Sequence, residues 1–150
     1  MNIVKLLHLR GLRHKFVWFA VNRIFCGANP KNFEIKRKLL NWAGYSIGKG
    51  TKIVGPIECF GHLKIGEDCW IGKNLKVNGN GNVIIGNRCD IAPEVTFQTG
   101  GHKIGDKSRR AGKGCIFTQI VKDGVWIGGR STILNNTTIG EGCVIAGCAC

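Results

Sequence analysis

The feature that most constrains the fold of this chain is an aliphatic residue that recurs every six positions from Tyr45 onward. The period slips by two positions after Val83 and later returns in the new phase. Its members are Ile47, Ile53, Cys59, Ile65, Ile71, Val77 and Val83, then Ile85, Ile91 and Phe97, and finally Val121, Ile127, Ile133, Ile139 and Ile145. A fixed internal period indicates a repeat architecture, in which each repeat stacks on the next.

Two further regularities predict the shape of each repeat. A glycine follows many of the aliphatic residues, at Gly48, Gly66, Gly72, Gly86, Gly128 and Gly140. A small or aliphatic residue stands four positions after them, at Thr51, Cys69, Cys89, Val95, Val125, Ser131, Thr137, Cys143 and Ala149. Three such strand-and-turn units close one triangular coil, and stacked coils bury a continuous core. We therefore predict an all-β fold, a parallel β-helix over residues 45–150, with Cys69, Cys89 and Cys143 as small buried side chains.

Residues 1–44 lack this period and are predicted to form a basic helical segment. Residues 1–45 carry nine Lys or Arg and a single acidic residue, Glu34. Asn29 before Pro30 is typical of a helix start, and Gly44 is typical of a helix end. Two roles stay open for this segment. It either packs as a cap over the first coil, or it uses residues 1–28, with their aromatic side chains, for peripheral contact with an anionic membrane.

Several classes of protein are excluded or disfavoured by the sequence. None of the eight cysteines forms a C-x-x-C pair, which excludes zinc ribbons and thioredoxin-like sites. No signal-peptide cleavage pattern is evident, and the longest early apolar run, residues 16–21, is far shorter than a membrane span. No aromatic-basic motif supports nucleic-acid binding. We expect a cytoplasmic protein with free thiols, peripheral at most at the inner face of the membrane.

The regular pattern stops after the repeat that begins at Phe97, and a loop insertion is predicted at residues 103–114. Insertions in repeat folds usually serve the binding face, which draws attention to His102 beside the loop. The alternative is a solvated surface histidine. The loop carries Lys103, Lys107, Arg109, Arg110 and Lys113 against Asp106 alone. It is either a binding element for phosphates or an anionic saccharide, or a solvated basic loop.

Two stretches of the chain resemble the hexapeptide-repeat (left-handed β-helix) acyltransferases. Val125-Trp126-Ile127-Gly128-Gly129 and the repeats that follow it, to Gly147, resemble the C-terminal coils of that family. Thr99-Gly100-Gly101-His102 through Gly112 resembles the stretch that holds its catalytic histidine. The resemblance covers residues 45–150. It is strongest to the O-acetyltransferases of exopolysaccharide and capsule synthesis, with maltose, galactoside and serine acetyltransferases as more distant relatives.

The resemblance implies a left-handed β-helix and transfer of acetyl from acetyl-CoA to a hydroxyl of a sugar or polysaccharide precursor. It implies His102 as the general base, which a hydroxyl nucleophile needs when it attacks a thioester. It also implies a homotrimer with each active site between subunits, and no metal. The acetyl-CoA contacts that it implies are Trp126, Gly129 and Gly147. Arg130 is near enough to them to suggest a contact with a phosphate of acetyl-CoA, and the proposed substrate contacts are Arg109 and Arg110.

Some alternatives stay open. They are a serine O-acetyltransferase, an amino-sugar N-acetyltransferase and a non-catalytic β-helix scaffold. A γ-type carbonic anhydrase needs three histidines around zinc, and only His62 and His102 lie in the repeats. Asp90, Glu94 and Asp106 are the acidic residues available as partners of His102. Residues 147–150 read Gly-Cys-Ala-Cys where the family has Gly-Ser-Val-Val. Family members also continue for another turn beyond this point. The resemblance therefore implies that the acetyl-CoA site is incomplete at Cys150.

Overall fold

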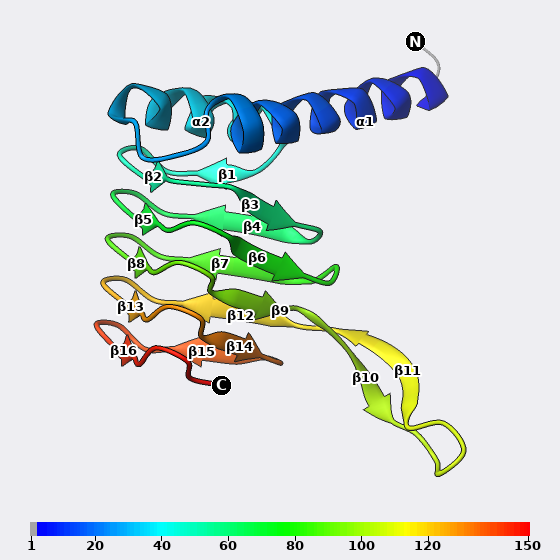
Figure 1. Ribbon diagram of the computed structural model, residues 1–150. Coiled ribbons are helices and arrows are strands. Elements are labelled where there is room, and N and C mark those ends of the chain that lie inside the picture. Colours follow the sequence, from blue (N-terminus) through cyan, green and yellow to red (C-terminus); the bar gives the residue numbers. More distant parts are fainter. Residues whose placement is uncertain (1–2) are drawn as a thin grey trace.

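The computed structural model describes residues 3–150, and their side chains from residue 11 onward. In the β-helix, consecutive short strands belong to three different parallel sheets (Figure 1). The first sheet contains β1 (Ser46–Ile47), β4 (His62–Ile65), β7 (Asn82–Ile85), β12 (Thr118–Val121) and β15 (Thr137–Ile139). The second contains β2 (Lys52–Ile53), β5 (Trp70–Ile71), β8 (Asp90–Ile91), β13 (Trp126–Ile127) and β16 (Val144–Ile145). The third contains β3 (Ile57–Cys59), β6 (Leu75–Asn78), β9 (Thr96–Gln98) and β14 (Thr132–Leu134). Each coil takes one strand from each sheet, and the chain winds as a left-handed β-helix (Figure 1).

The strand registers show how the six-residue period becomes a stack of coils. Ile47 pairs with Ile65, eighteen residues on, so three repeats make one coil. Ile65 pairs with Ile85, and the two extra residues in this coil are the slip seen in the sequence. Ile85 pairs with Val121 across twice the regular interval, because an insertion precedes β12.

The core is the ladder of inward side chains that these registers align. Ile53, Ile71, Ile91 and Ile127 form one column through the second sheet, and each is fully buried. Cys69 and Cys89 are buried as predicted. The prediction was wrong for Cys143, which is exposed because it lies on the last described coil and no further coil covers it.

Two helices cover one end of the β-helix. The first, α1 (Ile3–Phe19), continues into a π-helical turn, η1 (Ala20–Ile24), and the second is α2 (Pro30–Ala43). Asn29 caps α2 by accepting a hydrogen bond from the backbone N–H of Lys31 at 3.1 Å. Gly44 ends the helix with a left-handed backbone, φ 106°. Both predicted signals of helix start and end are therefore confirmed, and neither helix is long and apolar enough to cross a membrane, within the residues described.

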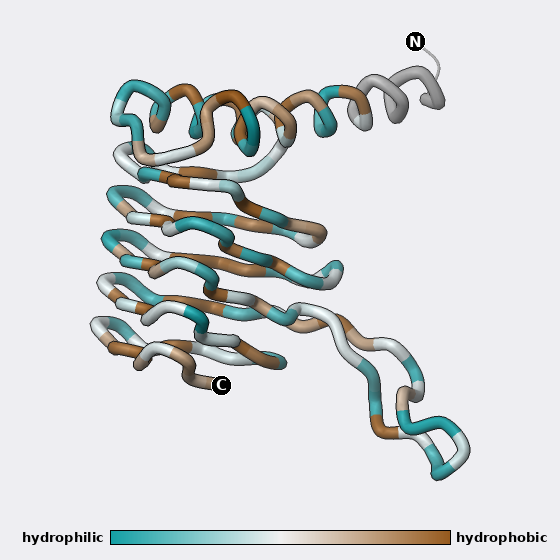
Figure 2. The backbone as a smooth tube through the Cα atoms, viewed as in Figure 1, coloured by the Kyte–Doolittle hydropathy of each residue, from teal (hydrophilic) through white to brown (hydrophobic). Residues whose placement is uncertain are grey.

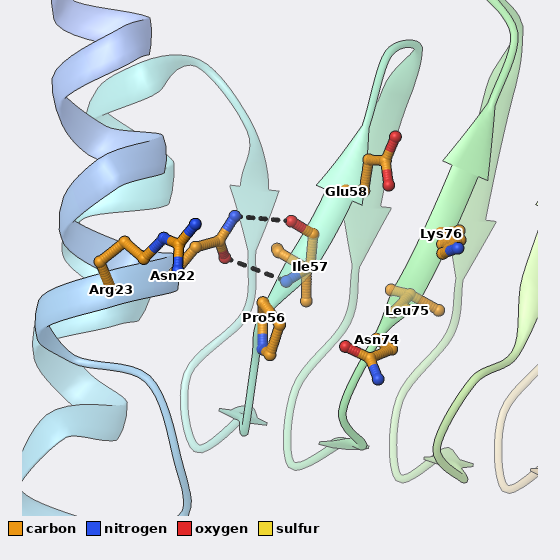
Figure 3. Close-up of a pocket in the computed structure, with 8 residues that line it drawn as sticks. All are labelled: Asn22, Arg23, Pro56, Ile57, Glu58, Asn74, Leu75 and Lys76. Atoms are coloured by element: carbon orange, nitrogen blue, oxygen red, sulfur yellow. Dashed lines mark hydrogen bonds between the residues drawn. The ribbon is translucent and has the colours of Figure 1, made fainter.

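The helices also pair with the open edges of all three sheets. The Asn41 amide donates to the carbonyl of Ile47 at 2.9 Å and accepts from its N–H at 2.7 Å. The Asn22 amide does the same for Ile57, at 2.8 and 3.0 Å (Figure 3). Directly after β2 of the second sheet, the carbonyl of Val54 accepts from the N–H of Gly27, in the connection before α2, at 2.8 Å and from the Lys36 ammonium at 3.1 Å. An unpaired sheet edge leaves backbone groups unsatisfied, so these contacts explain why the segment packs as a cap.

The insertion is a two-stranded ribbon where the sequence predicted a loop at residues 103–114. Strand β10 (Gly100–Ile104) pairs antiparallel with β11 (Ala111–Ile116), and the ribbon projects from the β-helix as an arm (Figure 1). Gly100 pairs with Ile116, so the strand pairing begins before residue 103. His102 therefore lies within a strand, opposite Gly114.

Candidate active site

His102 is held by one hydrogen bond across the ribbon. Its ring Nδ1 lies 2.8 Å from the carbonyl oxygen of Gly112. Because a carbonyl can only accept, Nδ1 carries the proton and donates it, which leaves Nε2 with a free lone pair when the ring is neutral. The imidazole is exposed, so Nε2 is accessible to a ligand. This is the orientation and tautomer that a general base needs.

An open hollow of about 530 Å³ lies beside His102. One wall is the base of the ribbon, with Gly101 and Cys115, and the other is the widened corner between β6 and β7. At that corner Gly79 has φ 95°, and a side chain there would collide with the backbone of Gly100. The polar lining comes from Asn78, Asn80 and Gln98, which the sequence analysis did not select. The two-residue slip between Val77 and Ile85 was the signal that this corner differs from the others.

The tip of the ribbon is a tight turn built around Asp106. Its carboxylate accepts hydrogen bonds from the hydroxyl and the N–H of Ser108, at 2.5 and 2.7 Å, and from the N–H of Arg109 at 3.3 Å. The hydrogen bond from the Ser108 hydroxyl is the main cause of a lowered pKa for Asp106. Asp106 therefore shapes the turn and does not contact His102. Arg109 and Arg110 lie exposed at this tip.

A second group of predicted residues lies on β13 and on the corner that follows it. Trp126 points outward, between Asp90 on the strand above and Val144 on the strand below. Gly129 and Gly147 stack at successive levels of the corner, where the Cys148 N–H donates to the Gly129 carbonyl at 2.9 Å. Within the described residues, neither glycine N–H donates to another backbone group. These two N–H groups are therefore available to a ligand that lies along the corner.

Arg130 belongs to this corner and is paired with an acid. Its guanidinium Nε donates to Glu94 at 2.9 Å, and this contact raises the pKa of Arg130. Both side chains are largely exposed and line a hollow of about 490 Å³ with Asn74, Lys76, Thr96 and Thr132. Glu94 is therefore engaged with Arg130, and Asp90 lies on β8, so neither contacts His102.

The two groups of predicted residues do not meet within one chain. The ribbon with His102, Arg109 and Arg110 leaves at the corner between the third and first sheets, after β9. The corner with Gly129 and Gly147 lies between the second and third sheets, at the opposite edge of the β-helix (Figure 1). Among the described residues, no three His, Cys, Asp or Glu side chains gather as a set of metal ligands.

Comparison with known proteins shows that the chain is similar to acyltransferases. No protein-family model matches it. It is 26% identical over 142 residues to galactoside O-acetyltransferase of Escherichia coli (strain K12), covering 91% of this chain and 66% of that protein. It is 34% identical over 118 residues to a candidate acetyltransferase of Saccharomyces cerevisiae, covering 77% of this chain and 58% of that protein.

The chain is therefore similar to acetyltransferases over most of its length. It spans 66% and 58% of the length of these two curated relatives.

Two solved structures have the same fold as this chain. A galactoside acetyltransferase in complex with coenzyme A superposes with a TM-score of 0.58 at 21% identity, over 95% of this chain and 70% of that one. AntD, an N-acyltransferase from Bacillus cereus in complex with dTDP-4-amino-4,6-dideoxyglucose and coenzyme A, also gives 0.58, at 18% identity over 75% of each chain. Both comparisons support the left-handed β-helix.

Proposed function

We propose that this protein is an acetyl-CoA-dependent O-acetyltransferase that acetylates a hydroxyl of a sugar or polysaccharide precursor, with His102 as the general base. The observation that carries the proposal is the hydrogen bond from His102 Nδ1 to Gly112, which leaves Nε2 free beside an open hollow. The galactoside O-acetyltransferase relative and the coenzyme A complexes of the structural neighbours support the reaction class and the donor.

The chemistry needs one proton acceptor. His102 Nε2 removes the hydroxyl proton while the oxygen attacks the thioester carbonyl of acetyl-CoA. The tetrahedral intermediate then collapses, the carbon–sulfur bond breaks, and coenzyme A leaves as its thiol after taking the proton from His102. The hollow lined by Asn78, Asn80 and Gln98 offers amide groups that could hydrogen-bond the other hydroxyls of a sugar.

The donor would lie along the corner of the second and third sheets. The unpaired N–H groups of Gly129 and Gly147 suit the amide carbonyls of the pantetheine arm, and Trp126 offers an exposed ring beside them. Arg130 could turn from Glu94 to a phosphate, because that ion pair is exposed and weak. Arg109 and Arg110 at the ribbon tip would hold donor phosphates or an anionic saccharide.

The separation of these two groups supports a homotrimer with a shared site. One chain cannot bring its own His102 to its own Gly147 corner, so the ribbon of a neighbouring copy would supply the base. The ribbon also exposes apolar side chains, Ile104 at 88% and Ile116 at 65%, which a neighbouring copy would cover. All eight cysteines are free thiols, which supports a reducing, cytoplasmic compartment.

A second candidate is N-acylation of an amino sugar. The complex of AntD with an amino-sugar nucleotide favours it, since an amine and a hydroxyl need the same donor and base. The choice between them depends on the acceptor, so the activity assay includes both types.

The proposal is tested by acceptor-dependent release of free coenzyme A thiol. The acceptors are galactosides, other oligosaccharides, amino sugars and serine. We expect His102→Ala to lower turnover by about a hundredfold to ten-thousandfold, the usual contribution of a general base. His62→Ala is the matched control, because His62 is an exposed histidine on β4 outside the hollow, and it should retain wild-type turnover. Equal turnover of His102→Ala and wild type would refute the base assignment.

A further inference from the structure

The helical cap buries one face against the first coil and leaves the opposite face uncovered. Val17 and Val21 point inward, as does Leu40 of α2. At about 100° per residue, Leu12, Phe16 and Phe19 share the outward side of α1, and Ile35 and Trp42 share that of α2. Between 40% and 59% of each of these five side chains is exposed. We name this surface, with its interspersed lysines Lys15, Lys31 and Lys38, the outer cap face.

The two helices form one continuous surface. The ring of Phe16 meets that of Trp42 edge to face, with centroids 6.5 Å apart. The guanidinium of Arg13 lies 5.6 Å from the centroid of the same tryptophan ring. The aromatic side chains of α1 therefore continue into α2, and the hydropathy colouring shows apolar and polar residues interspersed along both helices (Figure 2).

The charge of this surface is almost entirely positive. Lys15, Lys31 and Lys38 are all exposed. Glu34 is the only acidic residue between residues 11 and 44. Its carboxylate is held by Arg37 at 2.6 Å and lies 3.8 Å from Lys38, so the one negative charge is already neutralised.

We propose that the outer cap face docks the protein on the surface of an anionic lipid membrane. Half-exposed aromatic and aliphatic side chains among lysines suit the boundary between headgroups and acyl chains. A second copy of this chain is a poorer occupant, because two such faces would bring their lysines against one another and the like charges would repel. Docking through this end leaves the ribbon β10–β11, which slants away from the cap, clear of the bilayer (Figure 1).

The test is co-sedimentation of the full chain with vesicles of phosphatidylcholine mixed with phosphatidylglycerol, compared with phosphatidylcholine alone. We expect binding to the anionic vesicles and little to the neutral ones. The double variant Phe16→Ser/Phe19→Ser should lower the partition coefficient about thirtyfold, because each ring is already half-buried and only the remainder enters the membrane. Lys15→Gln and Lys31→Gln should each lower it about fivefold.

Phe60→Ser is the matched control. Phe60 follows β3 on a corner of the β-helix, does not belong to the outer cap face and is 67% exposed, so its loss should leave vesicle binding unchanged. Thermal melting followed by circular dichroism checks that the phenylalanine variant folds, and the lysine variants remain informative if it does not. Absence of vesicle binding by the wild-type chain, or an equal loss in Phe60→Ser, would overturn the proposal. Dissociation of an oligomer by Phe16→Ser/Phe19→Ser without vesicle binding by wild type would assign the face to a second copy instead.

Discussion

Replacing Asn22 tests how the helical cap is attached to the β-helix. Asn22 makes two hydrogen bonds with one residue of the edge strand, donating to the carbonyl of Ile57 at 2.8 Å and accepting from its N–H at 3.0 Å (Figure 3). Asn22→Ala removes both bonds and leaves two backbone groups at the sheet edge. Each lost hydrogen bond costs about 1 kcal/mol net, and water reaches the two unpaired backbone groups poorly, which adds to the cost. We therefore expect the free energy of unfolding to fall by about 2–3 kcal/mol.

The measurement is urea unfolding followed by circular dichroism, with the free energy of unfolding compared between variants. Asn22→Asp keeps the size of the side chain but places a carboxylate oxygen against the carbonyl of Ile57, so it should destabilise the protein at least as much. Asn32→Ala is the matched control, because the Asn32 side chain makes no hydrogen bond to another described residue, and its effect should stay within about 0.5 kcal/mol. An Asn22→Ala protein as stable as wild type would refute the edge-pairing explanation of the cap.

Two further predictions concern the core and a corner of the β-helix. Ile91→Ala removes a fully buried side chain between Ile71 and Ile127, and it should lower the free energy of unfolding in urea by about 2–5 kcal/mol. Ile145→Ala, in the same column but half-buried on the last described coil, should lower it clearly less. Equal losses in the two variants would contradict the packing argument. Hydrogen bonds from the backbone N–H of Asn87, and then from its side-chain amide, lower the pKa of Asp123. The ionised Asp123 therefore stabilises the fold above its ordinary pKa of 3.8, and this contribution is lost as the pH falls through the lowered pKa. The stability of Asp123→Asn should therefore fall less steeply than that of wild type below about pH 4, and parallel acid-unfolding curves would contradict this.

The parts of the fold that depend on local chemistry could be predicted from the sequence. The six-residue period predicted which side chains point inward, because every coil packs the same positions against its neighbours. Asn29 and Gly44 marked the bounds of α2 because helix capping involves only neighbouring residues. Cys143 was assigned wrongly because a repeat pattern cannot show whether another coil covers a given position.

The parts that depend on distant pairing could not be predicted. The segment at 103–114 is rich in glycine and charge, with no alternating apolar pattern, so nothing in it indicated a strand. The amide of Asn22 reaches a strand thirty-five residues later, and no local signal marks such a contact. The positions of His102 and Gly147 at opposite edges follow from the corner at which the ribbon leaves, which only the folded chain shows.

The most direct test of a shared active site is complementation between two inactive chains. His102→Ala lacks the base, and Gly147→Leu blocks the donor corner with a side chain on the exposed face. Each should be inactive alone in the thiol-release assay. In a cyclic trimer, a mixed assembly of the two chains restores one site of three, so purified mixed oligomers should recover about a third of wild-type turnover. Mixed oligomers that stay inactive, formed from chains that each fold, would contradict a site built from the ribbon of one chain and the donor corner of its neighbour.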